Sequence, residues 1–343
     1  MQDIWPQLEM WVDKGERFAM ATVVSASKPS PRGVGACLAI HEDGIRFIGS
    51  VSAGCVESEV IEAAKLCLAD GEARWLSFGP GQGFPWEIEL SCGGEIEVRV
   101  EPAPHLVEGC SAVSSVMYDC LRGHSLGMLV SDGTTHGFFD EHGETLPSGT
   151  NLSPKAITLA RRKIATGGST EELEVDGRRV LFRVLGKRPR LFVIGASHIA
   201  IHLVQLAKML QYEVVTIDPR DAYAQEERFF VKPDRLISEW PSLALDGYGV
   251  CERDCLVTIT HDPKIDDEAL ETALRSTCGY IGALGSRKSH AARLRRLEKA
   301  GFTAESLARI HGPVGLDIGS RTPAEIAVSV VAQLVQWRNG GRA

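Results

Sequence analysis

The chain has 343 residues, of which 44% are hydrophobic and 24% are charged, and its formal net charge at pH 7 is −8. This length and balance are typical of a globular protein with two domains of ordinary size. Because no basic tract offsets the acidic charge, nucleic acids and acidic membrane surfaces are excluded as expected partners, and small molecules or proteins remain. No signal-peptide pattern and no run of about 18 apolar residues occurs, so we expect a cytoplasmic protein with no membrane partner.

The first part of the chain predicts a mixture of strands and helices. In chain order, the predicted elements are a helix near 3–14, strands at 19–26 and 36–41 joined by a turn-rich loop, a strand at 45–51, a helix at 55–70, strands at 86–90, 95–100, 127–131 and 135–139, and a helix at 155–165. The charged, proline-containing segment Gly186–Arg190 is the expected boundary. We therefore predict a mixed α/β domain over residues 1–187.

From residue 188 onward, predicted strands and helices alternate strictly. In chain order, they are strands at 191–196, 213–218, 255–260, 279–285 and 308–311, helices at 197–211 and 286–301, and a final helix. The final helix begins after Thr322, because threonine as N-cap, Pro323 at the first helical position and Glu325 three residues after the cap form a capping box. Strict alternation implies parallel strands and crossover helices, so residues 188–343 predict a Rossmann-like, doubly wound parallel-sheet domain.

Cys55 stands between a predicted strand and a predicted helix, in the stretch GSVSAGCVESEV. The positive end of a helix dipole favours a thiolate there, and a thiolate is a better nucleophile and metal ligand than a thiol. Glu57 and Glu59 oppose this effect, and a small buried hydrophobe is the alternative interpretation. The nine cysteines are odd in number and scattered, so no disulfide framework is predicted.

Two further features of the first domain are candidate site elements. Cys92 lies in the tight link Ser91–Gly94 between two predicted strands, where two glycines permit a close turn. The loop 27–35, SKPSPRGVG, combines prolines, glycines that expose backbone N–H groups, and Arg32, whose guanidinium suits phosphate. A plain hairpin turn is the alternative for this loop.

The turn that follows the first strand of the second domain lies where a dinucleotide-binding fold places its glycine-rich loop. It begins with Gly195, and Asp218 ends the next strand 23 residues later, about where an acidic residue meets a ribose hydroxyl. Ser197 stands at the second glycine position, where its bulk crowds a pyrophosphate. A scaffold that no longer binds a dinucleotide is the alternative. His198, next in the turn, is either functional or an ordinary helix residue.

Polar residues also follow two later strands. His261 and Asp262 follow one, and Gly285, Ser286 and Arg287 follow the next. Open α/β sheets bind ligands at the carboxyl ends of their strands, and a helix N-terminus there suits an anion. The other arginines farther along the same helix are interpreted as solvated surface charge; they are Arg293, Arg295 and Arg296.

Together these stretches resemble the XdhC/CoxI family, the accessory proteins of xanthine dehydrogenase and related molybdenum hydroxylases. The blocks that carry the resemblance run in order from about residue 20 to the C-terminus: SPRGVGA, GSVSAGCVESEV, PWEIELSCGGEIEVRVEP, LFVIGASHIA with VVTIDPR, ITHDPKIDDEAL, YIGALGSRKSHAARL and IHGPVGLDIGSRTPAEIAVSVVAQ. The sequence departs from the family in two places. Ala53 and Gly54 stand where the family often has two glycines before the cysteine, and Ser197 stands in the first dinucleotide turn.

The resemblance implies an accessory protein, rather than a stand-alone enzyme, that binds the molybdenum cofactor, which is molybdopterin with its metal. Such a chaperone protects the cofactor while a cysteine desulfurase replaces one oxo ligand by sulfur, and then inserts it into a xanthine dehydrogenase-type hydroxylase. It also implies a homodimer. Cys55 and Cys92 would be the reactive thiols, with Cys55 contacting molybdenum or carrying a persulfide. The implied cofactor-binding residues are Arg32, Gly54, Cys55, Cys92, Gly195, Ser197, His198, Asp218, His261, Asp262, Gly285, Ser286 and Arg287.

Two other functions stay open from the residues alone. In the first, the second domain binds a nucleotide or NAD(P) as part of an oxidoreductase, with His261 or His290 handling the proton. The incomplete glycine pattern and the lack of an evident acid/base pair weigh against it. In the second, both cysteines are structural and the protein docks a hydroxylase to a desulfurase.

Overall fold

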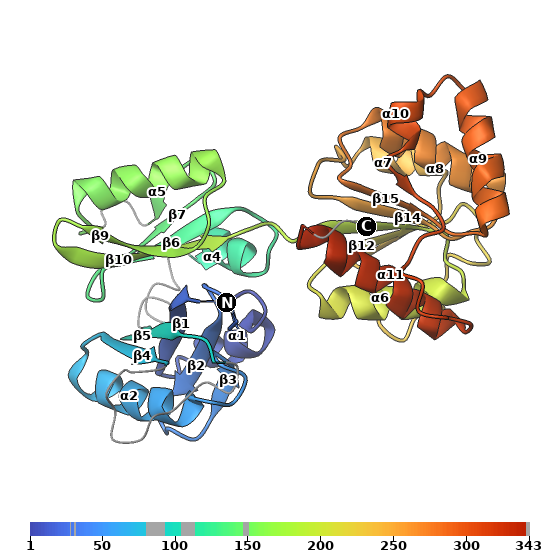
Figure 1. The fold of residues 1–343 in the computed structure, drawn as a ribbon. Coiled ribbons are helices and arrows are strands. Elements are labelled where there is room, and N and C mark those ends of the chain that lie inside the picture. The colour runs from blue at the N-terminus through green and yellow to red at the C-terminus, as the bar shows by residue number, and fades with distance from the viewer. Residues whose placement is uncertain (28, 31, 80–92, 104–113, 147–150, 341–343) are drawn as a thin grey trace. The chain divides into compact units, whose positions relative to one another are not determined.

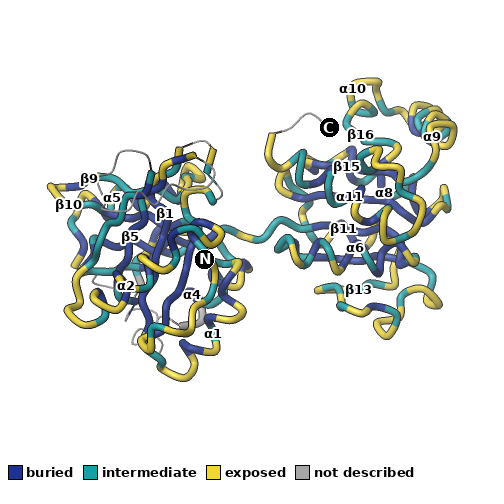
Figure 2. The backbone as a smooth tube through the Cα atoms, turned by 60° about the horizontal axis from the view of Figure 1, so that its bottom comes forward, coloured by how far each residue is buried: buried dark blue, intermediate teal, exposed yellow. Residues whose placement is uncertain are grey.

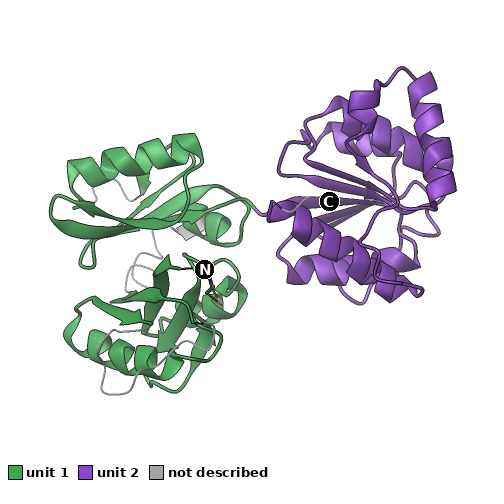
Figure 3. Cartoon of the chain, viewed as in Figure 1, with its two compact units in different colours: residues 1–187 green, residues 188–343 purple. Residues whose placement is uncertain are grey.

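The computed structural model describes residues 1–27, 29–30, 32–79, 93–103, 114–146 and 151–340 (Figure 1). The chain divides into two compact units, unit 1 with residues 1–187 and unit 2 with residues 188–343 (Figure 3). In each unit the buried part of the chain follows the strands, and exposed residues gather in loops and on outer helix faces (Figure 2).

The first sheet of unit 1 is antiparallel and has the strand order β3-β2-β1-β5-β4. Its strands are β1 (Phe18–Ala26), β2 (Cys37–His41), β3 (Phe47–Gly49), β4 (Arg74–Phe78) and β5 (Ile96–Pro102). Helix α1 (Trp5–Asp13) packs on one face with Phe18 and Met20, and helix α2 (Glu57–Asp70) packs on the other face with Ala19 and Ala21. The central strand β1 is therefore buried on both faces, which explains its continuous apolar sequence.

The second sheet of unit 1 is also antiparallel, with the order β8-β7-β6-β10-β9. Its strands are β6 (Gly127–Ser131), β7 (His136–Phe139), β8 (Thr145–Leu146), β9 (Glu171–Val175) and β10 (Arg178–Leu185). Helix α5 (Pro154–Thr166) covers one face through Ala156 and Ala160. On the other face, Leu129 and Phe138 join the core of α1 and of the short helix α4 (Ser114–Leu121).

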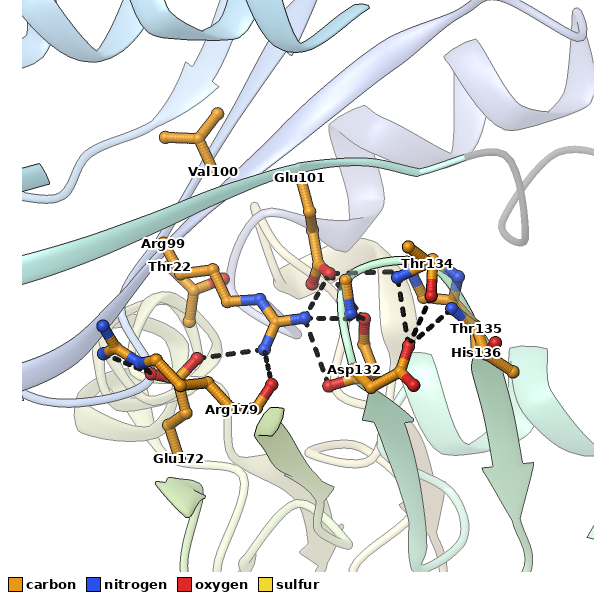
Figure 4. A network of polar contacts seen from close by, with 12 residues as sticks. Thr22, Arg99, Val100, Glu101, Asp132, Thr134, Thr135, His136, Glu172 and Arg179 are labelled. Carbon is orange, nitrogen blue, oxygen red and sulfur yellow. Dashed lines mark hydrogen bonds and ion pairs between the residues drawn. The ribbon is translucent and has the colours of Figure 1, made fainter. Parts of the chain in front are cut away.

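A buried ionic network connects the two sheets of unit 1 (Figure 4). Arg99 on β5 is fully buried, and its guanidinium donates to Glu101 at 2.8 Å, to Glu172 on β9 at 2.9 Å and to the hydroxyl of Ser131 on β6 at 2.9 Å. Burial alone would raise the pKa of Glu101, but His136, Arg99 and Ser131 hold it far below its ordinary value. Each carboxylate in this network thus depends on donors from the opposite sheet.

Unit 2 is built on a six-stranded parallel sheet with the order β13-β12-β11-β14-β15-β16. Its strands are β11 (Arg190–Ile194), β12 (Glu213–Ile217), β13 (Arg235–Ile237), β14 (Cys255–Thr258), β15 (Tyr280–Ala283) and β16 (Ile310–His311). The chain proceeds outward from β11 to β13, returns to β14 and continues to the other edge. This is the strand order of a Rossmann fold, so the predicted fold class is confirmed.

Helices cover both faces of this sheet. Helices α6 (His198–Met209) and α11 (Pro323–Arg338) pack on one face, and α7 (Pro241–Asp246), α8 (Pro263–Arg275) and α9 (Arg287–Lys299) on the other. The 3-10 turn η2 (Glu226–Arg228) and the short helix α10 (Ala304–Leu307) complete the unit. The predicted capping box at Thr322 and Glu325 is present. None of the helices in the described part of the chain has the length and apolar character needed to span a membrane.

The sequence pattern does not predict β4, β9 or β10. Strands β9 and β10 form a hairpin through Asp176 and Gly177, which have φ of 52° and 76° as a two-residue type I′ turn requires. The Asp-Gly pair is the signal that could have identified this hairpin. The predicted strand at 86–90 lies outside the described residues.

Candidate functional site

The loop before α2 carries Cys55 and is organised by Glu57, the first residue of the helix. The carboxylate of Glu57 accepts hydrogen bonds from the hydroxyl of Ser50 at 2.6 Å, from the hydroxyl of Ser52, and from the N–H groups of residues 51, 52, 54 and 56. The N–H of Cys55 donates to the Ser52 hydroxyl at 2.9 Å. The loop that carries Cys55 is therefore held by hydrogen bonds to the Glu57 carboxylate of the same chain.

Glu57 is ionised under all ordinary conditions. Burial alone would raise the pKa of Glu57, but the hydroxyls of Ser50 and Ser52 and the backbone N–H groups hold it at about 2. Its negative charge lies at the helix start, where it offsets the positive end of the helix dipole. The structure thus supports the opposing effect of Glu57 that the sequence indicates, and Cys55 is held in place by a tightly bonded loop.

The backbone next to Cys55 has an unusual conformation. Ala53 has φ of 65° and Gly54 has φ of 110°, both in the region that favours glycine. Both residues are exposed, and a Cβ placed on Gly54 would meet no atom within 4 Å. Gly54 is therefore required for its conformation, and the space beside Cys55 on this side is open.

Two loops that carry predicted site residues, Arg32 in one and Gly54 with Cys55 in the other, lie at one end of the first sheet beside residues 93–95. Because the sheet is antiparallel, the chain leaves β1 after Ala26, enters β2 at Cys37, leaves β3 after Gly49 and enters β5 at Ile96 at the same end. Cys55 packs against the same core cluster as Ala26 and Ile96. We call the described residues of the loop 27–36, together with residues 50–56 and 93–95, the loop end of the first sheet.

Contacts within the loop end join two of its segments. Glu95 and Ser27 exchange hydrogen bonds of 2.7 and 2.8 Å, and a Cβ on Gly94 would lie 1.9 Å from the carbonyl oxygen of Pro29. Residues 93–95 therefore pack directly on the loop 27–36. Cys92, which precedes them, lies outside the described residues.

Arg32 has an ion-pair partner in the structure. Its Nη2 lies 3.2 Å from Oδ2 of Asp3 near the start of α1. The Arg32 side chain is about one-third exposed, with 36% of its surface accessible. A phosphate at Arg32 would therefore compete with Asp3.

Burial separates Cys55 from most of the other cysteines. Of the seven that the structure describes, five are buried, and only Cys55 and Cys251 are half-buried. Burial raises the pKa of Cys67, Cys120 and Cys278 to about 12, as expected for structural thiols. Among the described residues, no group of three or more His, Cys, Asp or Glu side chains could hold a metal ion.

In unit 2 the glycine-rich turn after β11 is closed by protein groups. Gly195 has φ of 108°, and a Cβ there would lie 2.6 Å from Cγ2 of Thr260. The N–H of Ala196 donates to Asp218 at 2.8 Å, and its carbonyl accepts from Arg228 at 2.8 Å. Asp218 is fully buried, so it stabilises the turn from within.

Asp218 also holds Arg220, whose Nε and Nη2 lie 2.8 and 2.7 Å from its two carboxylate oxygens. Burial alone would raise the pKa of Asp218, but Arg220 and the Ala196 N–H lower it. The guanidinium of Arg220 stacks 3.9 Å from the ring centre of Tyr223. Sequence reasoning missed Arg220, although it follows Asp218 directly in the stretch VVTIDPR, and it brings positive charge to the turn.

The other predicted site residues of unit 2 lie at the same edge of the parallel sheet, where the carboxyl ends of its strands meet. We call it the strand-end edge. Asp262 is the N-cap of α8 and accepts from the N–H of Lys264 at 2.9 Å, and Ser286 is the N-cap of α9. His198, His261 and Arg287 are exposed, and Ser197 is half-buried at the N-cap of α6.

The interpretation of Arg293 as solvated surface charge is wrong, because only 5% of the surface of this residue is exposed. Asp266, 1% exposed on α8, faces it.

Comparisons with known proteins find matches in both units of the chain. Residues 191–334 match a family model described as the XdhC Rossmann domain, and residues 11–79 match one described as the XdhC and CoxI family. A Bacillus subtilis protein named as a probable xanthine dehydrogenase subunit is 27% identical over 98% of both chains. An Escherichia coli protein named molybdenum cofactor insertion chaperone PaoD is 25% identical over 94% of this chain and 84% of that protein.

A solved structure supports the fold. A Bacillus halodurans protein described as a xanthine dehydrogenase superimposes with a TM-score of 0.78, at 24% identity, over 100% of this chain and 97% of that one. The likeness therefore extends through both units and includes both sheets of unit 1.

Proposed function

The chain belongs to the XdhC and CoxI family, and from this premise we propose that it is a chaperone for the molybdenum cofactor. The client is a xanthine dehydrogenase-type hydroxylase, and a cysteine desulfurase supplies sulfur while the cofactor is held. The names of two full-length relatives support this proposal, since one is named for xanthine dehydrogenase and the other is named a molybdenum cofactor insertion chaperone. The protein acts as a homodimer and inserts its cargo rather than catalysing a reaction of its own.

The observation that carries the proposal is the loop end of the first sheet. It presents Cys55 half-buried on a loop that Glu57 fixes, beside open space at Gly54. A thiol on a fixed loop is held in one orientation, which is what repeated capture and release of a cargo requires. Cys55 either contacts the metal of the cargo or carries a persulfide, and Cys92 serves as the second thiol.

Unit 2 binds a phosphate-bearing ligand, which is either the molybdenum cofactor or a nucleotide. The strand-end edge supports this assignment, because it collects the helix starts at Ser197 and Ser286 together with Arg220 and Arg287. The alternative, a hydride-carrying dinucleotide, is less favoured. Both carboxylate oxygens of Asp218 already accept hydrogen bonds, so a ribose hydroxyl would compete with Arg220 and Ala196.

Cofactor content tests the proposal. The parent, Cys55→Ser and Cys251→Ser are purified without oxygen from molybdenum-replete cells, and molybdenum and pterin are measured per chain. Cys251 is the matched control, because it is the other half-buried cysteine among the described residues. We expect the parent and Cys251→Ser to carry the cofactor, and Cys55→Ser to retain about one tenth or less. A parent protein without cofactor would contradict the proposed chaperone function. Equal cofactor content in all three proteins would show that Cys55 does not hold the cofactor.

The role of Cys55 is resolved by mass spectrometry after incubation with a cysteine desulfurase and cysteine. An added sulfur atom on the Cys55 peptide, and none on the Cys251 peptide, identifies a persulfide carrier. Unmodified Cys55 in a protein that loses its cofactor on Cys55→Ser identifies a metal contact.

A further inference from the structure

Helix α9 begins beside the carboxyl end of β15 with donors that its own turn does not use. The first N–H groups of any helix lack a carbonyl one turn earlier, and here these belong to Arg287 and Lys288. The next N–H, of Ser289, is capped by the Ser286 hydroxyl at 3.1 Å. Gly285 precedes the cap with φ of 146°, where a side chain would be strained.

Arg293 lies beneath this turn. Its side chain is 6% exposed, and its Nη2 donates to the carbonyl of Leu284 at 2.9 Å. Its Nε and Nη1 are buried with no hydrogen-bond partner among the described residues. Nη1 lies 3.9 Å from the point that a Cβ on Gly285 would occupy, so the guanidinium reaches the turn from below. Buried polar groups in native structures are almost always bonded, so unused charged donors here indicate a missing acceptor.

The nearby carboxylate does not supply that acceptor. Oδ2 of Asp266 lies 3.4 Å from Nη2 of Arg293, longer than the roughly 2.7–2.9 Å of a charge-assisted hydrogen bond. Oδ1 of Asp266 accepts from the hydroxyl of Thr260 at 2.7 Å, which turns the carboxylate toward the end of β14. Burial also raises the pKa of Asp266, in spite of Thr260 and Arg293. Asp266 therefore pairs with Nη2 alone, and Nε and Nη1 of Arg293 have no acceptor among the described residues.

We propose that Arg293 and the first turn of α9 form a binding site for a phosphate monoester. The N–H groups of Arg287 and Lys288 contact the phosphate oxygens from the helix end, and the guanidinium of Arg293 contacts them from beneath Gly285. The site deepens the proposed function and rests on it for its cargo, because the phosphate belongs either to the pterin or to a nucleotide.

Thermal unfolding of the full chain in inorganic phosphate tests the site. Arg293→Met combined with Asp266→Asn removes the buried pair without leaving either charge alone. The control is Arg296→Met combined with Asp267→Asn, since Arg296 and Asp267 form the neighbouring, more exposed pair between the same helices. We expect phosphate to raise the melting temperature of the parent and the control, and the apparent phosphate affinity of the Arg293 variant to fall about tenfold or more.

General stabilisation by phosphate would raise the melting temperatures of all three proteins equally, and that result would overturn the proposed site. No stabilisation of the parent would overturn it as well. If the Arg293 variant does not fold, amide NMR of the parent decides the question. Phosphate must then shift the amide signals of Gly285, Arg287 and Lys288, and unshifted signals would refute the proposal.

Two further measurements identify the source of the phosphate and test this site separately from the proposed function. Adenosine monophosphate that binds at the same amides much more tightly than phosphate indicates a nucleotide, and equal affinity indicates a terminal phosphate such as that of the pterin. A phosphate site in a protein that retains no molybdenum would keep the site and overturn the chaperone. A protein that retains molybdenum but whose amide signals do not shift in phosphate would keep the chaperone function and overturn the phosphate site.

Discussion

The sequence predicts that the starts of helices α2 and α9 both favour negative charge, a thiolate of Cys55 at α2 and a bound anion at α9, yet the chain completes them differently. At α2, Glu57 folds back and accepts the N–H groups of its own loop, so the protein supplies the negative charge itself. At α9, the neutral hydroxyl of Ser286 caps one N–H, and Arg293 adds buried positive charge below. A helix start is therefore open to an outside anion only where no acidic side chain of the first turn already occupies it.

The largest expected effect is the loss of the internal acceptor at α2. Glu57→Ala leaves several partly buried donors of the loop without a partner, so we expect the free energy of unfolding to fall by about 2–4 kcal/mol. Urea unfolding measures this loss. Glu59→Ala is the control, because Glu59 is exposed on the same turn and should change stability by less than about 0.5 kcal/mol. Equal effects of the two substitutions would show that Glu57 does not organise the loop.

The same carboxylate gives a pH dependence with a definite sign. The pKa of Glu57 falls from 4.5 to about 2 on folding, so folding favours the ionised form. Its contribution is complete above about pH 4.5 and disappears as the pH falls toward 2. Allowing for partial exposure, we expect about 1–2 kcal/mol. The difference in unfolding free energy between the parent and Glu57→Gln should shrink over this range, and a constant difference would contradict the assignment.

The sequence predicts unit 2 better than unit 1 for a physical reason. Strands such as β11 and β14 are buried on both faces and read as short apolar runs, and the capping box at Thr322 is a purely local signal. In unit 1, β9 and β10 carry many charges, and they are stabilised by the network around Arg99. Such partners come from distant parts of the chain, which local patterns do not contain.

The candidate sites follow the same rule. The position of Cys55 just before a helix is predicted correctly, because it depends on neighbouring residues alone. The burial of Arg293 depends on Asp266 and Leu284, which reach it from α8 and from the end of β15. A basic helix surface and a buried basic residue look the same in the sequence, so solvated charge was the wrong interpretation there.

A smaller effect is expected at the start of α9, where the cap is neutral. Ser286→Ala removes the acceptor of the Ser289 N–H, and the usual loss for such a cap is about 1 kcal/mol. Because a hydroxyl does not titrate, this loss should be the same at neutral and acidic pH, in contrast to the effect of Glu57→Gln. Urea unfolding at both pH values checks this. A pH-dependent loss would mean that a charged group also caps α9.

The last two effects concern the two residues before Cys55, and they should have opposite signs at these neighbouring positions. Ala53 has φ of 65°, a region in which a side chain is strained, so Ala53→Gly relieves strain but increases the entropy of the unfolded chain. The net gain should be about 0.5 kcal/mol. Gly54 has φ of 110°, so Gly54→Ala should destabilise by about 1 kcal/mol or more although the space around it is open. Thermal unfolding of both variants measures the pair. If both substitutions destabilise, the loop is set by contacts of the Ala53 methyl group rather than by the hydrogen bonds that Glu57 accepts.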